Sequence, residues 1–199
     1  MSKQPTENIL VVKREQLFQG ATLTDFFALP SFESWEKIIK ENQEFHPRNL
    51  MEEDASYKQI IPYLVYMHNN RYFLMERAST SSEQRLKSKK SLGIGGHIRE
   101  EDLDEKNIID WAQREFHEEV SFSGKLTIKP LGIINDESNA VGKVHIGFVF
   151  LLSGDSDNIS IRSELKSGTL LTLTECAEYY PNMERWSQLV FDYLKTNPQ

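Results

Sequence analysis

Residues 108–119 read IIDWAQREFHEE, and the pattern of this stretch predicts a helix around which the rest of the fold can be arranged. One apolar stripe is formed by residues that recur at helical spacing, namely Ile108, Ile109, Ala112 and Phe116. Such a stripe turns toward the core of a globular domain. We therefore predict a helix from about residue 106 to residue 120 with this stripe buried.

Three glutamates share another face of this helix. Glu115, Glu118 and Glu119 stand at i, i+3 and i+4, so their side chains project from one sector. A divalent cation would turn their mutual repulsion into coordination, because Mg²⁺ prefers carboxylate oxygens, waters and phosphates. Arg114 could fix the geometry by pairing with Glu118 or with an acid in the preceding loop. A solvated acidic helix face is the commoner alternative.

Glycines stand upstream, where a strand over residues 92–98 is expected to end. Gly93, Gly95 and Gly96 allow the backbone to approach a phosphate, or to ligate a metal through a carbonyl. A β-bulge is the other explanation for such a strand end. Together with the glutamates, these glycines favour a metal or phosphate site over a simple solvated face.

The flanking sequence predicts strands on both sides of the helix. The apolar runs 59–67 and 71–77, separated by His68-Asn69-Asn70, predict a hairpin. Further strands are predicted at 8–13, 126–134, 144–152 and 170–174, with helices starting near Pro30-Ser31 and covering 183–195. The last helix carries its apolar face at Trp186, Leu189, Val190 and Tyr193. This order predicts a layered, mixed α/β or α+β domain.

The stretch GGHIREEDLDEKNIIDWAQREFHEEVSF, residues 95–122, resembles the Nudix box. Its second half, REFHEE, matches the pattern closely, except that Ser121 stands where the pattern has glycine. The loop in the first half is four residues longer than in the pattern. The first acid of the box is therefore either Asp102 or Glu105.

The resemblance implies a Nudix-type fold, an α+β (α/β/α) sandwich with a mixed sheet between helices. It covers residues 57–199 and leaves residues 1–56 as an N-terminal extension packed on the core. That extension could also pack on a partner subunit, so a homodimer stays open.

The resemblance also implies an activity. Nudix hydrolases typically cleave a nucleoside diphosphate linked to another group, using Mg²⁺ or Mn²⁺. Carried over, the metal ligands are Glu115, Glu118, Glu119 and the Gly96 carbonyl, and Arg114 orients a glutamate. The base that activates water is Glu118 or Glu119, or an acid outside the box, for which the candidates are Asp136, Glu137 and Glu164.

Substrate contacts are predicted just before and after the glycines. The basic stretch Arg85, Lys87, Lys89 and Lys90 could receive phosphates, and His97 could touch the substrate. A solvated loop and a structural histidine are the respective alternatives. His145, in a predicted strand, is likewise either a substrate contact or a structural histidine.

Composition limits the partners and the compartment. The 199 residues carry a formal net charge of −7, so overall charge attracts neither a nucleic-acid duplex nor an anionic membrane. No apolar run approaches the roughly 20 residues that span a bilayer, and the N-terminus lacks a secretory pattern. The single Cys176 fits a reducing, cytoplasmic compartment. Neither cysteine pairs nor histidines at zinc-ligand spacing occur, so no structural zinc site is predicted.

Two rival functions remain. Isopentenyl-diphosphate isomerase shares the fold, and residues 76–90 followed by GGH are similar to its approach to the active site. That chemistry needs a cysteine beside the Gly-His element, where this chain has Gly95, whereas Cys176 lies far along the sequence. The other rival is a non-catalytic Nudix domain that binds a nucleotide-type ligand and signals through residues 1–56.

Overall fold

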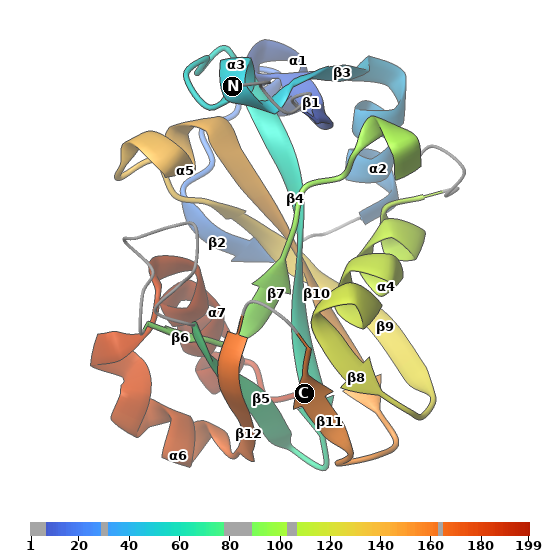
Figure 1. The fold of residues 1–199 in the computed structure, drawn as a ribbon. Coiled ribbons are helices and arrows are strands. Elements are labelled where there is room, and N and C mark those ends of the chain that lie inside the picture. The colour runs from blue at the N-terminus through green and yellow to red at the C-terminus, as the bar shows by residue number, and fades with distance from the viewer. Residues whose placement is uncertain (1–6, 29–31, 78–88, 103–106, 163–164) are drawn as a thin grey trace, which may run out of the picture. The chain divides into compact units, whose positions relative to one another are not determined.

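The computed structural model describes residues 7–28, 32–77, 89–102, 107–162 and 165–199 (Figure 1). The helices are α1 (Arg14–Phe18), α2 (Phe32–Asn42), α3 (Arg48–Met51), α4 (Ile108–Glu119), α5 (Ala140–Val144), α6 (Leu173–Cys176) and α7 (Arg185–Thr196). The strands are β1 (Asn8–Lys13), β2 (Asp25–Ala28), β3 (Gln43–Pro47), β4 (Tyr57–His68), β5 (Arg71–Arg77), β6 (Lys90–Ser91), β7 (Gly93–Gly95), β8 (Val120–Phe122), β9 (Leu126–Asn135), β10 (His145–Gly154), β11 (Ile159–Ile161) and β12 (Leu165–Leu171).

The chain forms two compact units. The first unit comprises Met1–Pro62, Gly95–Trp111 and Pro130–Val149, and the second comprises Tyr63–Ile94, Ala112–Lys129 and Phe150–Gln199. Every passage of the chain from one unit to the other falls inside a regular element: β4, β7, α4, β9 or β10. The predicted fold class, a mixed sheet with helices, is confirmed.

Residues of the N-terminal segment pair with strands of the first unit. β1 runs antiparallel to β3 and to the start of β4, with Val11 opposite Gln59. β2 runs antiparallel to β9, with Phe27 opposite Ile133. Ile9 and Val11 are fully buried in one cluster with Met51. The predicted strand 8–13 is confirmed, whereas α1, β2, β3 and α3 were not predicted.

The second unit contains the turn of the predicted hairpin. β4 and β5 pair antiparallel, with Met67 opposite Tyr72. Asn69 and Asn70 adopt positive φ values of 48° and 58°, which suits the tight turn between twisted strands. β12 pairs with β5 on its other edge (Figure 1). The two apolar runs and the polar turn between them therefore predicted this part correctly.

The end of the strand predicted at 170–174 is wrong. β12 stops at Leu171, and α6 begins at Leu173. Thr172 caps α6: its hydroxyl accepts from the Glu175 N–H, and the Glu175 carboxylate accepts from the Thr172 N–H. This capping box, a Thr followed three residues later by Glu, outweighs the β propensity of the threonines.

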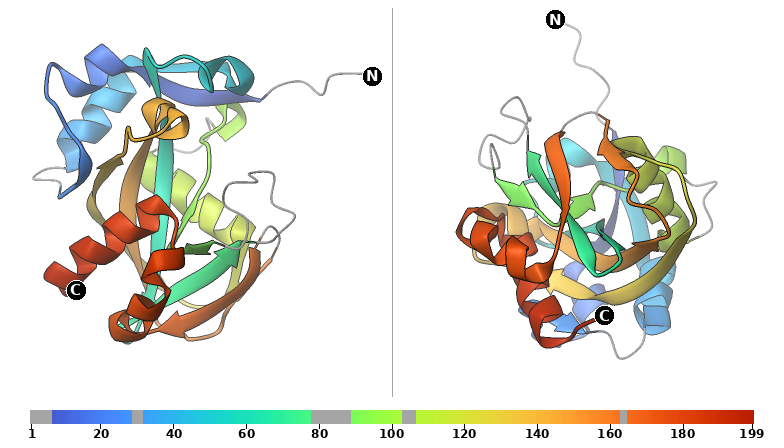
Figure 2. Two further views of the ribbon diagram at one scale, coloured as in Figure 1. Left: turned by 90° about the vertical axis from the view of Figure 1, so that its left-hand side faces the viewer. Right: turned by 90° about the horizontal axis from the view of Figure 1, so that it is seen from below.

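The closing helix α7 is anchored by its first turn. The Glu184 N–H donates to the Lys90 carbonyl at 3.0 Å, and the Ser187 hydroxyl accepts from the Leu92 N–H at 2.9 Å. The turn before α7 therefore lies beside β6 (Figure 2). Leu189 and Val190 are buried as predicted, while Trp186 and Tyr193 are half-buried.

Candidate functional site

α4 presents the three glutamates that the sequence singled out. The Arg114 Nη1 lies 2.5 Å from Glu118 Oε1, which confirms the predicted pairing four residues apart. The other nitrogen, Nη2, lies 3.8 Å from Glu115 Oε2. The Glu115 side chain is 14% exposed and that of Glu118 is 49% exposed. One guanidinium thus contacts two carboxylates of the cluster and offsets part of their repulsion.

Aromatic packing sets the rotation of α4. Phe116 is fully buried and stacks on Tyr66 with the ring centroids 5.8 Å apart. It also meets Phe122 edge-on at 6.0 Å. Ala112 is buried one turn earlier, whereas Ile109 of the predicted stripe is only half-buried. Because this apolar side is fixed, the glutamates must project from another sector of the helix.

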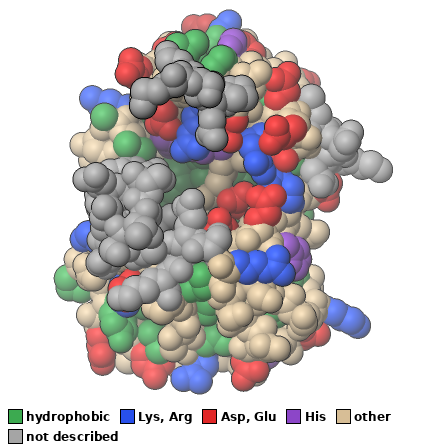
Figure 3. Space-filling view, viewed as in Figure 1, with side chains coloured by type: hydrophobic (Ala, Val, Ile, Leu, Met, Phe, Trp, Pro, Cys, Tyr) green, Lys and Arg blue, Asp and Glu red, His purple; other side chains and the backbone are tan. Residues whose placement is uncertain are grey.

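The residues around the glutamates are well connected. The Glu119 carbonyl accepts from the Arg162 N–H at 2.9 Å, and the Arg162 guanidinium donates to the His117 carbonyl at 2.8 Å. Ser121, the departure from the Nudix pattern, lies in strand β8 opposite Ser160. Extended backbone does not require glycine, so this departure leaves the end of α4 intact. In Figure 3, acidic side chains gather near the middle of the face shown, with basic side chains beside them.

The first half of the Nudix-like stretch lies in the first unit. Gly96 follows β7 directly. Asp102 is buried, and its Oδ2 accepts from the Arg99 N–H at 2.8 Å, while its carbonyl accepts from the Trp111 indole at 2.7 Å. The Asp102 carboxylate therefore closes the turn η2 (Glu100–Asp102). Glu105, the other candidate for the first acid, lies outside the described residues.

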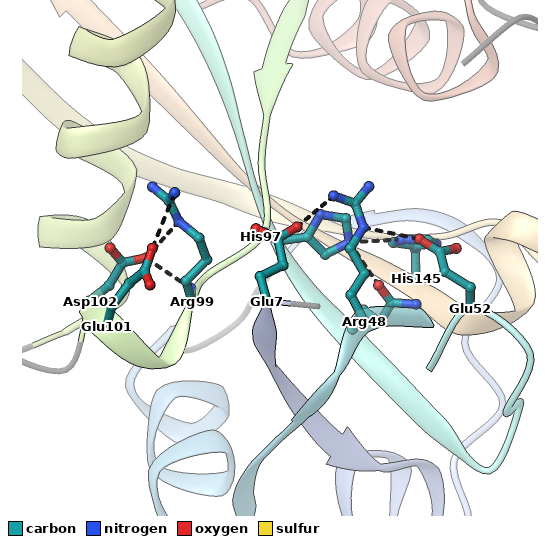
Figure 4. A network of polar contacts seen from close by, with 9 residues as sticks. Glu7, Arg48, Glu52, His97, Arg99, Glu101, Asp102 and His145 are labelled. Carbon is teal, nitrogen blue, oxygen red and sulfur yellow. Dashed lines mark hydrogen bonds and ion pairs between the residues drawn. The ribbon is translucent and has the colours of Figure 1, made fainter. Parts of the chain in front are cut away.

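His97 takes part in a cluster that the sequence did not predict (Figure 4). Its Nε2 lies 2.7 Å from Gln59 Oε1 and 3.3 Å from His145 Nε2. Burial lowers the pKa of His97 well below its usual value, and the charges of Arg48 and His145 act in the same direction. Burial therefore favours the neutral form of the His97 imidazole.

Glu52 completes this cluster. The ligand atoms of Glu52, His97 and His145 all lie within 4.8 Å of one another. The Arg48 Nε contacts Glu52 Oε1 at 3.3 Å, and its Nη1 contacts Glu7 Oε1 at 2.7 Å (Figure 4). Rules based on local spacing do not find such a group, because its members come from three distant segments. No other sequence signal marks it.

The loop acids proposed as bases have other contacts. Glu137 lies 2.5 Å from Arg14 and 3.0 Å from the ammonium of the fully buried Lys58. Burial alone would raise the pKa of Glu137, but these hydrogen bonds outweigh burial and lower it. Asp136 is buried, and its Oδ1 accepts from the Ser138 N–H. Glu164 lies outside the described residues.

The predicted basic contacts are only partly described. Arg85 and Lys87 lie outside the described residues. Lys89 is half-buried just before β6. Lys90 pairs with Glu76 at 2.8 Å and lies 5.3 Å from the Tyr179 ring centroid. Both of these contacts of Lys90 lie within the second unit.

Cys176 is buried, as a structural residue would be. Its Sγ lies 3.9 Å from the Leu171 carbonyl oxygen. Burial raises the pKa of this thiol to about 12, and the charge of Glu175 adds to the effect. Such a thiol does not exchange protons readily near neutral pH.

Among the described residues, no helix has the length and apolar character needed to cross a membrane.

Comparisons with known proteins identify relatives of this chain in sequence and in structure. No protein-family model matches the sequence. The chain is 34% identical over 211 residues to protein YmaB of Bacillus subtilis strain 168, covering 95% of this chain and 98% of YmaB. The crystal structure of Tm1382, a candidate Nudix hydrolase, is 30% identical with a TM-score of 0.81, covering 96% of this chain and 99% of Tm1382.

More distant structures share the fold alone. The Nudix domain of Shewanella oneidensis NrtR, complexed with ADP ribose, is 13% identical with a TM-score of 0.57, covering 71% of this chain and 89% of that domain. A bifunctional NMN adenylyltransferase/ADP ribose pyrophosphatase of Francisella tularensis, complexed with AMP and a Mn ion, is 15% identical with a TM-score of 0.52, covering 70% of this chain and 41% of that protein.

Proposed function

We propose that this chain, which belongs to the Nudix hydrolase family, is a Mg²⁺-dependent pyrophosphohydrolase. Its substrate would be a nucleoside diphosphate linked to another moiety, and the bond cleaved would be the phosphoanhydride. The observation that carries this proposal is the set of three glutamates on α4, braced by Arg114. A soluble, cytoplasmic location is part of the same proposal.

The donor set on α4 fits a hard divalent cation. Glu115, Glu118 and Glu119 supply carboxylate oxygens, the ligands that Mg²⁺ and Mn²⁺ prefer. Arg114 holds one oxygen of Glu118 and so restrains the orientation of that carboxylate. When bound, the cation would neutralise charge on the pyrophosphate and lower the pKa of a coordinated water. The Gly96 carbonyl is proposed as a further ligand.

The chain's own residues would then direct the hydrolysis. Glu118 or Glu119 accepts a proton from the attacking water, whose oxygen forms a bond to phosphorus. The bond from that phosphorus to the bridging oxygen breaks, and the bridging oxygen leaves with the second phosphate. No covalent intermediate with the protein is required, since positioning and electrostatics supply most of the catalysis.

The substrate class is supported by the distant structures. The NrtR Nudix domain is complexed with ADP ribose, and the Francisella protein is named an ADP ribose pyrophosphatase. We propose ADP ribose and related dinucleotides and nucleotide sugars as the first substrates to test. Arg85 and Lys89 remain proposed substrate contacts, whereas the Nε2 of His97, also predicted as a substrate contact, lies against Gln59 and His145.

The test is a panel of nucleoside diphosphate derivatives assayed with Mg²⁺, with Mn²⁺ and with a chelator. Glu118→Gln should lower kcat by about 100-fold or more, the usual loss when a general base is removed. Glu178→Gln is the matched control, because Glu178 is an exposed glutamate of the same unit. Turnover that persists in the chelator, or that Glu118→Gln leaves unchanged, contradicts the proposal.

The two rivals make different predictions in this assay. An isomerase needs an accessible thiol, whereas Cys176 is buried with its pKa raised to about 12. A binding-only domain would retain a panel member without turnover. Ligand binding by the wild type in the absence of any product would therefore replace the hydrolase proposal with the binding one.

A further inference from the structure

The cluster of Glu52, His97 and His145 belongs wholly to the first unit and contains none of the α4 glutamates. It joins two imidazoles and one carboxylate drawn from the turn after α3, the segment after β7 and the start of β10. Figure 4 shows the side chains converging. We propose that this cluster is a second metal site, suited to Zn²⁺ or a similar borderline divalent cation, that goes beyond the proposed hydrolase centre.

The spacing of the two imidazoles supports the proposal. Zinc lies about 2.0–2.1 Å from a histidine nitrogen, and two nitrogens at a tetrahedral angle are then about 3.3–3.4 Å apart. The Nε2 atoms of His97 and His145 are 3.3 Å apart. This separation is therefore compatible with both imidazoles binding one zinc ion.

The orientation of His145 is already that of a metal ligand. Its Nδ1 lies 2.8 Å from the Val141 carbonyl oxygen. Because a carbonyl can only accept, Nδ1 must carry the hydrogen, and Nε2 then directs its lone pair toward the cluster. A ring nitrogen that donates to a backbone carbonyl is the usual support for a metal-bound histidine.

The other two ligands are also held by neighbours. Arg48 contacts the Glu52 carboxylate, and Glu7 balances the charge of Arg48 (Figure 4). Gln59 donates from Nε2 to the Met51 carbonyl at 3.1 Å, which turns its Oε1 toward His97. For His97 to bind a cation through Nε2, the proton that Nε2 donates to Gln59 Oε1 would have to move to Nδ1 or to water.

The ligand types determine which metal is expected. Mg²⁺ prefers all-oxygen coordination, whereas imidazoles favour Zn²⁺ and other borderline cations. Two histidines and one glutamate leave a position for water. A hydrogen-bonded network without metal is the alternative, in which the His97 N–H is shared between Gln59 and His145.

Metal titration distinguishes these possibilities. Full-length protein is treated with a chelator, dialysed, and titrated with Zn²⁺ by calorimetry against a competing chelator. We expect one tight equivalent in the wild type, its loss in His97→Gln, and affinity weakened about tenfold or more in Glu52→Gln. Removal of a residue that only supports a ligand typically lowers metal affinity 10–100-fold, so loss of a direct ligand should have at least a comparable effect.

Two control variants make the result specific. Glu53→Gln changes the exposed neighbour of Glu52 and should leave the affinity unchanged. Glu118→Gln should also leave it unchanged, which separates this site from the α4 centre and from the proposed hydrolase activity. If Glu118→Gln abolishes the tight equivalent while Glu52→Gln does not, the metal is held by α4 and the proposal is overturned.

Cobalt provides a readout that does not depend on activity. Co²⁺ in a four-coordinate site with histidine ligands absorbs strongly in the visible range, and we expect this absorption in the wild type but not in His97→Gln. Circular dichroism and thermal melts check that each variant is folded; Glu52→Gln changes an exposed side chain and decides the question even if His97→Gln does not fold. Equal Zn²⁺ affinity in the wild type, Glu52→Gln and Glu53→Gln overturns the proposal.

Discussion

The ammonium of Lys58 is fully buried and makes three polar contacts. It lies 3.0 Å from Glu137 Oε1, and it donates to the carbonyls of Gly142 at 2.9 Å and His145 at 3.3 Å. Burial lowers the pKa of Lys58, and the hydrogen bond that Lys58 donates to Glu137 opposes that effect. Glu137 therefore acts as the counter-ion of a buried cation.

Glu137→Gln should lower the free energy of unfolding by about 2 kcal/mol near pH 6, because it leaves Lys58 without its counter-ion. The pKa of Glu137 is lowered from its ordinary value of 4.5, so its stabilising effect is present above about pH 4.5 and is lost as the pH falls further. Urea unfolding at several pH values should show the difference from wild type shrinking below pH 4.5. A constant difference from pH 6 to pH 3 would contradict this assignment.

Arg114 holds two carboxylates of the proposed metal centre. Arg114→Lys keeps the charge but lacks the planar fork that reaches both Glu115 and Glu118. We expect kcat to fall about tenfold and the Mg²⁺ concentration for half-maximal activity to rise. Arg71→Lys, at an exposed residue of the same unit, is the control and should leave both quantities unchanged. A pure change in the KM for substrate would instead place Arg114 among the substrate contacts.

At this scale the sequence predicted contacts within one helix and missed contacts between segments. The pairing of Arg114 with Glu118 follows from their spacing of four residues. The meeting of His97 with His145 depends on β7 and β10 being placed by the fold, and no local pattern encodes it. Asp102, one of the two candidates for the first acid of the Nudix box, accepts from the Arg99 N–H within its own turn.

At the scale of elements, α4 depends on one buried aromatic ring. Phe116→Ala removes the ring that stacks on Tyr66 and meets Phe122, and should lower the free energy of unfolding by about 3–5 kcal/mol. Gln113→Ala changes an exposed position of the same helix and should be nearly neutral. Denaturant unfolding of both variants measures the contrast, and similar values for the two would show that α4 is not anchored as described.

The short helix α5 requires glycine for space. A Cβ on Gly142 would lie 1.6 Å from the Asp136 carbonyl oxygen. Gly142→Ala must therefore displace the backbone of the loop after β9, at a cost of about 3 kcal/mol. Lys143→Ala, at the exposed next residue, is the matched control. A thermal melt of Gly142→Ala that coincides with the control would contradict the close approach.

Element types with a strong local signal could be predicted from the sequence. The hairpin of β4 and β5 has two apolar runs and a turn of two asparagines, and α4 has a clear apolar stripe. Short elements could not be predicted, because α1 and α3 have five and four residues and gain their stability from tertiary contacts. The end of β12 was predicted too long because the capping box of α6 was not recognised.

At the scale of the whole molecule, the division at residue 56 remains a prediction. The relatives YmaB and Tm1382 align over almost the entire chain, so their similarity includes most of the N-terminal segment. β1 and β2 supply partners to β4 and β9. We interpret residues 1–56 as an integral part of the first unit.

A chain that begins at Tyr57 tests this interpretation. It lacks the strands opposite Gln59 and Ile133, so edges that are paired in the full chain become exposed. We expect the shortened chain either to aggregate or to melt at a temperature lower by about 10 °C or more, because several kcal/mol of its free energy of unfolding would be lost. Calorimetry compares it with the full-length protein. A cooperative melt close to that of the full chain would show the segment to be a true appendage.

The passages between the two units also limit how gene rearrangement can combine this protein with others. Each unit is assembled from separated stretches of sequence, and each passage falls within β4, β7, α4, β9 or β10. No continuous gene fragment encodes either unit, and a crossover at any passage would divide a strand or a helix. Neither unit can therefore be transferred to another protein as one continuous segment of sequence.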